Sequence, residues 1–325
     1  MSLLQVNNLV VEFPSRRGTL RALDDISFDI APGEILGVVG ESGAGKSLTG
    51  AAIIGLLEPP GRIASGQVLL EGQRIDNLSH DGMRHIRGRK IGAIFQDPLT
   101  SLNPLYSIGR QLTETIRTHL PVSAAEARRR AIGLLEDTGI PGAAQRIDHY
   151  PHQFSGGMRQ RVVIALALAA EPKLIVADEP TTALDVSIQA QIIQLLKRIC
   201  KERGAAVMLI THDMGVIAET CDRVAVMYAG RMAEIGPVRQ VIHQPAHPYT
   251  MGLMAAIPDI TEDRERLNQI DGAMPRLNAI PAGCAYNPRC PRAFERCRLE
   301  RPDLLAAGAT RAACWLHDAH AEVAA

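Results

Sequence analysis

A glycine-rich segment near the N-terminus carries residue types suited to binding phosphate. Residues 40–47 read G-E-S-G-A-G-K-S and fit the P-loop pattern G-x-x-x-x-G-K-[ST]. Glycines allow backbone N–H groups to curl around phosphate oxygens, and the start of a following helix adds positive potential. Lys46 would reach the β- and γ-phosphates, while the Ser47 hydroxyl would bind Mg²⁺. The predicted nucleotide-binding residues are Gly40, Glu41, Ser42, Gly43, Ala44, Gly45, Lys46 and Ser47.

Two adjacent carboxylates follow an apolar segment in the middle of the chain. Residues 174–177 read L-I-V-A, and Asp178 and Glu179 come directly after them. Asp178 suits Mg²⁺, and Glu179 is placed to polarise an attacking water molecule. Alone, such a pair fits two solvated loop acids better. Together with the upstream P-loop, it predicts hydrolysis of a nucleoside triphosphate.

Residues 154–161, which read F-S-G-G-M-R-Q-R, resemble the signature motif of ABC ATPases, usually written LSGGQ. Ser155 can cap a helix that begins at Gly156 and Gly157, and its hydroxyl and the free N–H groups then form an anion site. Phe154 stands where the family usually has Leu, and Met158 where it usually has Gln. The family dimerises head to tail, so the resemblance implies that this segment meets the γ-phosphate held by the second subunit.

The other motifs of the family follow in its usual order. The resemblance implies that Gln96 contacts Mg²⁺ and links the core to a helical insertion, and that His212 contacts the γ-phosphate. Phe13 stands where an aromatic ring stacks on adenine, although plain packing in a strand explains it equally well. A segment that crosses the dimer interface is implied at Ala183, Leu184 and Asp185. The resemblance thus implies an ATPase that uses ATP and Mg²⁺, with Glu179, His212 and Gln96 as catalytic residues and Ser47, Gln96 and Asp178 around the metal.

The elements that must position these residues alternate between short apolar runs and helical stretches. Runs at residues 34–39, 174–177 and 207–211 suit strands of a parallel sheet covered on both faces. Residues of about 98–165 read as mostly helical. We therefore predict an α/β fold, a P-loop NTPase core of the ABC ATPase type with a helical insertion, over residues 1–237. Prolines recur after this point, which predicts a loop-rich C-terminal extension over residues 238–325.

The extension contains a short segment and four cysteines that point to one subgroup of the ABC ATPases. Residues 244–250, Q-P-A-H-P-Y-T, resemble the ATPases of oligopeptide, dipeptide and nickel importers. The cysteines match neither zinc-ribbon pairs nor ferredoxin spacing, yet four thiols in a short proline-rich segment could converge on one metal centre. The resemblance favours a [4Fe–4S] cluster; a zinc site and free thiols are the alternatives. The four positions are Cys284, Cys290, Cys297 and Cys314.

Composition excludes some classes of function. Lys plus Arg and Asp plus Glu are equal at 35 each, so no net positive charge supports sequence-independent binding to nucleic acid. The longest apolar stretches, such as residues 162–170, fall short of the roughly 20 residues needed to span a bilayer, and the N-terminus lacks a secretory signal. We expect the protein at the cytoplasmic face of the plasma (inner) membrane, held there by other chains.

The resemblance implies the partners of an importer ATPase: a second ATPase subunit (a paralogue or a second copy), two transmembrane permease subunits, and an extracytoplasmic solute-binding protein. Import of di- or oligopeptides is the expected function, with nickel or another small solute as the alternative. Soluble ABC ATPases of DNA repair, chromosome structure or translation usually carry two ATPase units or long coiled coils, which this chain lacks. A metal-cluster sensor that uses ATP only for regulation conflicts with the presence of Glu179. A role in phosphonate breakdown conflicts with the four cysteines.

Overall fold

The computed structural model describes residues 2–16, 18–182, 185–257 and 269–318. The chain forms two compact units, each built from discontinuous segments. The first, called the helical unit below, comprises Met1–Leu4, Ile30–Ile35 and Leu70–Ile210. The second, called the P-loop unit, comprises Gln5–Asp29, Leu36–Leu69 and Thr211–Ala325. The P-loop and the C-terminal extension therefore belong to the same unit.

Three short parallel strands form the sheet of the helical unit. Strand β7 (Leu174–Asp178) lies between β6 (Ile91–Ile94) and β8 (Ala206–Ile210) and pairs with both. Nearly all of their side chains are buried, which explains the continuous apolar runs in the sequence, because such strands are covered on both faces. A two-residue strand, β5 (Gln73–Arg74), also belongs to this unit.

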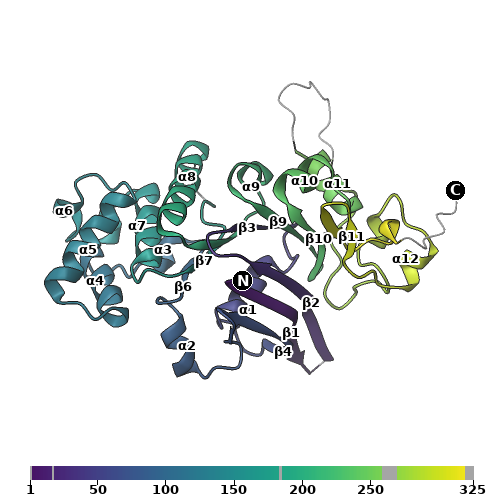
Figure 1. The fold of residues 1–325 in the computed structure, drawn as a ribbon, viewed down its shortest axis with the longest axis horizontal. Helices are drawn as coiled ribbons and strands as arrows, with labels where there is room; N and C mark the ends of the chain where they lie inside the picture. The colour runs from purple at the N-terminus through teal and green to yellow at the C-terminus, as the bar shows by residue number, and fades with distance from the viewer. Residues whose placement is uncertain (1, 17, 183–184, 258–268, 319–325) are drawn as a thin grey trace. The chain divides into compact units, whose positions relative to one another are not determined.

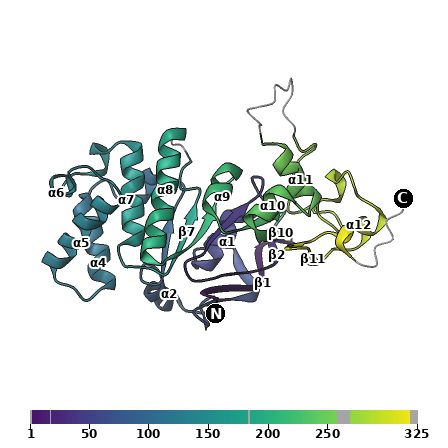
Figure 2. The same ribbon diagram turned by 45° about the horizontal axis from the view of Figure 1, so that its top comes forward.

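Helices make up most of the helical unit, as Figure 1 shows in teal. Serine side chains cap several of them, Ser107 at α4 and Ser123 at α5, where each accepts a backbone N–H of the first turn. Helices α4, α5 and α7 pack on one another, and α8 packs on α7 (Figure 2). The helices are α2 (His80–Ile86), α3 (Pro98–Ser101), α4 (Ile108–His119), α5 (Ala124–Asp137), α6 (Ala143–Arg146), the 3-10 turn η1 (Pro151–Gln153), α7 (Gly156–Leu168) and α8 (Val186–Arg203).

The P-loop unit contains a second group of strands. Strand β3 (Ile35–Val39) pairs in parallel with β9 (Arg223–Tyr228), which pairs antiparallel with β10 (Arg231–Pro237). A smaller sheet has the order β2–β1–β4. Its strands are β1 (Leu4–Ser15), β2 (Gly18–Ile30) and β4 (Arg62–Leu70).

The described part of the C-terminal extension, residues 238–257 and 269–318, contains regular elements. Strand β12 (Thr310–Ala312) pairs antiparallel with β10, with Glu234 opposite Ala312, and β11 (Leu305–Ala307) pairs with β12. Through β12 and β11 the extension adds two short strands to the sheet that contains β10. The helices of this unit are α1 (Lys46–Ile53), α9 (Met214–Thr220), α10 (Val238–His243), α11 (Pro248–Ala255) and α12 (Glu295–Leu299), with 3-10 turns η2 (Asn287–Arg289) and η3 (Trp315–His317).

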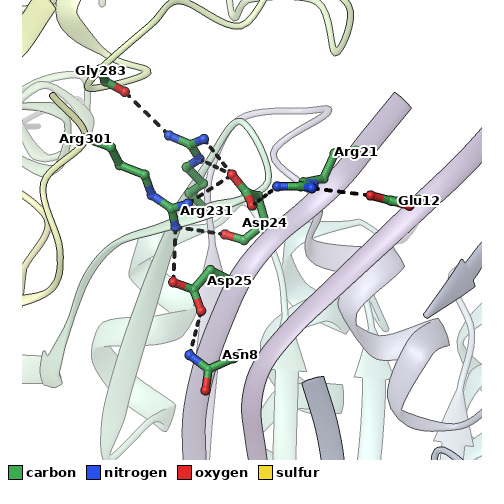
Figure 3. A network of polar contacts seen from close by, with 8 residues as sticks. All are labelled: Asn8, Glu12, Arg21, Asp24, Asp25, Arg231, Gly283 and Arg301. Atoms are coloured by element: carbon green, nitrogen blue, oxygen red, sulfur yellow. Dashed lines mark hydrogen bonds and ion pairs between the residues drawn. The ribbon is translucent and has the colours of Figure 1, made fainter. Parts of the chain in front are cut away.

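An ion-pair network around buried Asp24 ties strand β2 to β10 and to the extension (Figure 3). The Asp24 carboxylate accepts hydrogen bonds from Arg231 at 2.9 and 2.5 Å and from Arg301 at 3.1 Å. Arg21 donates to its other oxygen at 3.1 Å. Burial opposes ionisation of Asp24, but the guanidinium groups of Arg231 and Arg301 outweigh burial and hold its pKa below the ordinary value.

No helix in the described part of the chain is both long and apolar enough to cross a bilayer.

Candidate active site

The P-loop lies between β3 and α1, and two of its glycines are sterically required. Gly40 has φ +151° and Gly45, which precedes the first residue of α1, has φ +101°. A Cβ atom at Gly40 would lie 2.3 Å from the Met227 carbonyl oxygen, and one at Gly45 would lie 2.6 Å from the Leu23 side chain. Because side chains are excluded there, the loop can curl closely and turn backbone N–H groups toward an anion.

Lys46 sits inside the curl of this loop. Its side chain is buried, and its ammonium group donates to the carbonyl oxygens of Gly40 at 2.8 Å and Glu41 at 3.1 Å. Ser42, Gly43 and Ser47 are exposed, so both the outer face of the loop and the first turn of α1 are open to a ligand. The loop thus forms a cradle with a cation at its centre, which suits a polyphosphate.

Glu41, the second residue of the P-loop, is held by the C-terminal extension. Its backbone N–H donates to the Tyr249 hydroxyl at 2.9 Å, and its carboxylate pairs with Arg289 at 3.0 Å. Tyr249 belongs to residues 244–250, the segment that resembles the ATPases of oligopeptide, dipeptide and nickel importers. That segment is itself fixed by buried Glu234, whose carboxylate accepts the backbone N–H groups of Ala246 and His247, each at 2.9 Å. Nothing in the sequence pattern pointed to these partners of the P-loop.

The helical unit holds Asp178, Glu179 and Gln96. Asp178 ends β7, and Glu179 follows with φ +44°, a left-handed conformation that is costly for a residue with a side chain. The Glu179 carboxylate accepts hydrogen bonds from Gln96 at 3.1 Å and from the Thr182 hydroxyl at 2.9 Å. Strained residues with fixed side chains cluster at functional sites. Thr182 was not among the residues predicted for the site.

Ser155 caps α7 in the helical unit. Its hydroxyl accepts the Met158 N–H at 3.4 Å, and Gly156 and Gly157 form the exposed or half-buried first turn. Phe154 is only 3% exposed, so the aromatic ring anchors the loop in the core where the family has Leu. A Cβ atom at Gly157 would lie 2.9 Å from Ile188 on α8, which explains a glycine there.

Three further predicted residues have defined surroundings. Asp185 caps α8, where its carboxylate accepts the Ile188 N–H at 3.1 Å and so keeps its pKa below the ordinary value. His212 is exposed and precedes Asp213, the cap of α9. Phe13 is half-buried, and its ring lies against Gly61. The predicted interface residues Ala183 and Leu184 lie outside the described residues.

The four C-terminal cysteines line one small cavity together with Trp315 and Leu316. Burial raises the pKa of the Cys284 and Cys314 thiols to about 11. No three His, Cys, Asp or Glu side chains within the described ranges converge closely enough to hold a single metal ion. Outside the cavity, Cys200 and Cys221 are buried as packing residues.

Two protein-family models match this chain. Residues 23–182 match the family model described as ABC transporter, and residues 233–297 match the oligopeptide/dipeptide transporter C-terminal region. The chain belongs to the ABC transporter ATPases of the oligopeptide/dipeptide group. ABC ATPases use ATP together with Mg²⁺, so the P-loop cradle belongs to a nucleotide-hydrolysing enzyme.

Relatives match over almost the full length. The dipeptide transport ATP-binding protein DppD of Escherichia coli is 47% identical over 94% of this chain and 93% of its own length. DppD of Bacillus subtilis is 46% identical over 98% and 96%. A putative peptide import ATP-binding protein of Brucella abortus is 46% identical over 96% and 94%.

Solved structures share the same fold. A dimeric ATP-binding cassette in a post-hydrolysis state with ADP and Pi superposes with a TM-score of 0.65, is 30% identical, and is matched over 73% of this chain and 99% of its own. CbiO1 of Clostridium perfringens, part of an ABC transporter complex, gives a TM-score of 0.65 and 31% identity over 75% and 91%. The expected P-loop NTPase fold is confirmed.

Proposed function

We propose that this ABC ATPase hydrolyses ATP to drive import of di- or oligopeptides through a membrane transporter. The observation that supports this most is the relation to dipeptide and peptide import proteins over both matched regions, the ATPase region and the C-terminal region.

In this proposal the P-loop holds the phosphates. The cradle that excludes a Cβ at Gly40 and Gly45, with buried Lys46 at its centre, fits a triphosphate. Ser47, Gln96 and Asp178 would surround Mg²⁺, which supplies charge neutralisation for the transferring phosphoryl group when bound. Phe13 would contact the adenine ring. The signature residues Ser155, Gly156 and Gly157 would complete the site of a second subunit.

Glu179 is proposed to hold the attacking water and accept its proton. Two donors, Gln96 and Thr182, fix one carboxylate oxygen, so the other oxygen has a defined direction and the side chain need not be ordered during the reaction. His212 is proposed to contact the γ-phosphate. General-base assistance of this kind contributes roughly 10²–10⁴ in rate.

The organisation that we propose has a nucleotide-binding domain over residues 1–237, including a helical subdomain of about 98–165, and an extension over 238–325. ABC ATPase subunits of peptide importers dimerise and work with membrane permeases. We propose a second ATPase, a paralogue or a copy of this chain, with Ala183, Leu184 and Asp185 at the interface. Two permease subunits would hold the dimer at the cytoplasmic face of the inner membrane, and a solute-binding protein would deliver the peptide.

One substitution tests the catalytic role. Glu179→Gln should retain binding of ATP and lose about 10²-fold or more of steady-state hydrolysis, whereas Lys46→Ala should weaken nucleotide binding itself. Glu171→Gln is a matched control, because Glu171 lies in the same unit, has φ +56° and pairs on the surface with Arg130. Hydrolysis by Glu179→Gln at the level of the control variant would refute the assignment.

The four cysteines are proposed to bind a [4Fe–4S] cluster. They line one cavity, and their number and type match the thiolate set of such a cluster. A tetrahedral zinc site would need its sulfur atoms about 3.8 Å apart, given Zn–S bonds of about 2.3 Å. The described residues contain no such set, and a zinc site stays the alternative to the cluster. When bound, the cluster would add to the stability of the folded extension, and the chain's own role would be to release the thiol protons.

A further inference from the structure

Glu41 places a carboxylate inside the proposed phosphate-binding loop. Its side chain is 28% exposed, so it is only partly screened by water. An unpaired carboxylate there would repel the negatively charged phosphates, because like charges in a partly buried site interact strongly. Its charge therefore has to be balanced by a cation in the protein.

Arg289 supplies that cation from the C-terminal extension. One of its terminal nitrogens donates to both Glu41 oxygens, at 3.1 and 3.0 Å, and its side chain is only 7% exposed. The remaining donors bind backbone: Nε donates to the Asp271 carbonyl at 2.8 Å, and the other terminal nitrogen donates to the Ile270 carbonyl at 3.2 Å. The planar guanidinium group is thus fixed before any ligand arrives.

The backbone of Glu41 is fixed by the same extension. Its N–H donates to the hydroxyl of Tyr249, which is completely buried in α11. The Tyr249 ring packs against Tyr228 and Tyr286 with centroids 4.7 and 5.4 Å away. Tyr286 stands just before the turn that carries Arg289. One packed group in the extension therefore holds both the side chain and the main chain of the second P-loop residue.

We propose that Arg289 is a positioning residue for nucleotide binding, which neutralises Glu41 and fixes the P-loop, so that the C-terminal extension sets the affinity for ATP. The inference rests on the proposed nucleotide site. Arg289 directly precedes Cys290, so the cysteine-lined cavity lies one residue from the clamp on the P-loop.

The test is a double-mutant cycle on the dissociation constant of a fluorescent ATP analogue with Mg²⁺. Arg289→Ala should weaken binding about tenfold, as expected for the loss of one hydrogen-bonded charge pair. The loss should be smaller at high salt, because the repulsion from Glu41 is screened. Adding Glu41→Gln to Arg289→Ala should recover most of the loss, since the repelling carboxylate is gone. Arg289→Lys keeps the charge and should lose less than the Ala variant, which covers the case in which Arg289→Ala does not fold.

Arg296→Ala is the matched control. Arg296 is also an arginine of the extension, stacks on Trp315 at 3.6 Å and pairs with Asp318 at 2.7 Å, but takes part in none of the contacts with Glu41. The Arg296→Ala variant should bind the ATP analogue with a dissociation constant near that of the unchanged protein. An equal loss in Arg296→Ala, or no recovery on adding Glu41→Gln, would overturn the inference. Failure of the unchanged protein to bind the analogue would instead refute the proposed nucleotide site.

Discussion

Replacing Asp24 by Asn is expected to destabilise the P-loop unit strongly. The change keeps the size of the side chain and removes its charge, which leaves Arg231 and Arg301 facing a neutral amide. Both guanidinium groups donate to the same Asp24 oxygen, at 2.5 to 3.1 Å. The side chain of Asp24 is 10% exposed and that of Arg231 is 23% exposed, so water replaces the lost partner poorly.

The magnitude follows from these contacts. One ion pair at close range is worth about 4 kcal/mol at an effective dielectric constant of 20, and the desolvation of the charges offsets part of it. Removing one partner of a buried pair costs about 3–5 kcal/mol, because the other charge is left uncompensated. Since Arg301 is one-third exposed and can regain water, we expect a loss near the lower limit, about 3 kcal/mol.

The pH dependence gives a second measure. The pKa of Asp24 is lowered in the folded protein by Arg231 and Arg301 against the opposing effect of burial. A lowered folded pKa stabilises the protein above the unfolded value of about 3.9, and this stability is lost as pH falls through the folded pKa. The difference in free energy of unfolding between the Asp24→Asn variant and the unchanged protein should therefore reach its full value at pH 7 and shrink below about pH 4.

Urea unfolding followed by tryptophan fluorescence measures the effect. The sequence has one tryptophan, Trp315, which lies in the extension of the same unit and so reports on its unfolding. Asp29→Asn is the control, because Asp29 forms an exposed pair with Arg223 at 3.6 Å and should cost less than about 1 kcal/mol. The reasoning would be refuted if Asp24→Asn lowered the free energy of unfolding no more than Asp29→Asn does. A loss for Asp24→Asn that is the same at pH 7 and at pH 3 would also refute it.

Three further outcomes are expected. Gly45→Ala should weaken ATP binding, measured by titration, because its Cβ would collide with a core side chain at 2.6 Å; unchanged affinity would contradict the cradle. Mixing Ser155→Arg with Lys46→Ala protein should restore part of the ATPase activity if the chain homodimerises, because one composite site is then intact, whereas no recovery between folded variants would indicate an obligate paralogue. Anaerobically purified protein should be brown and contain iron, and Cys290→Ser should lose both the visible absorption and the iron; one zinc and no iron would replace the cluster by a zinc site.

Much of the site was predictable because short motifs determine their own local structure. The glycines of residues 40–47 have few alternatives to a tight loop, and a serine before two glycines can cap a helix wherever it occurs. The strands at 34–39, 174–177 and 207–211 were placed to within a residue as β3, β7 and β8. The helix expected after the P-loop is short. It ends at Ile53, with Gly55 following at φ +66°.

The sequence by itself determined which segments bind phosphate or carry the carboxylates, and what local shape each segment has. The interactions that form these segments join residues only a few positions apart. The tertiary structure alone decided which distant groups support them. Arg289 and Glu41 are 248 residues apart, and Asp24 meets Arg301 across 277 residues. Strands β11 and β12 have only three residues each, which is too few for a recognisable alternation of apolar and polar residues. They form because the edge of β10 is available for pairing with β12. Charge pairing and sheet edges depend on packing, which no periodicity in the sequence records.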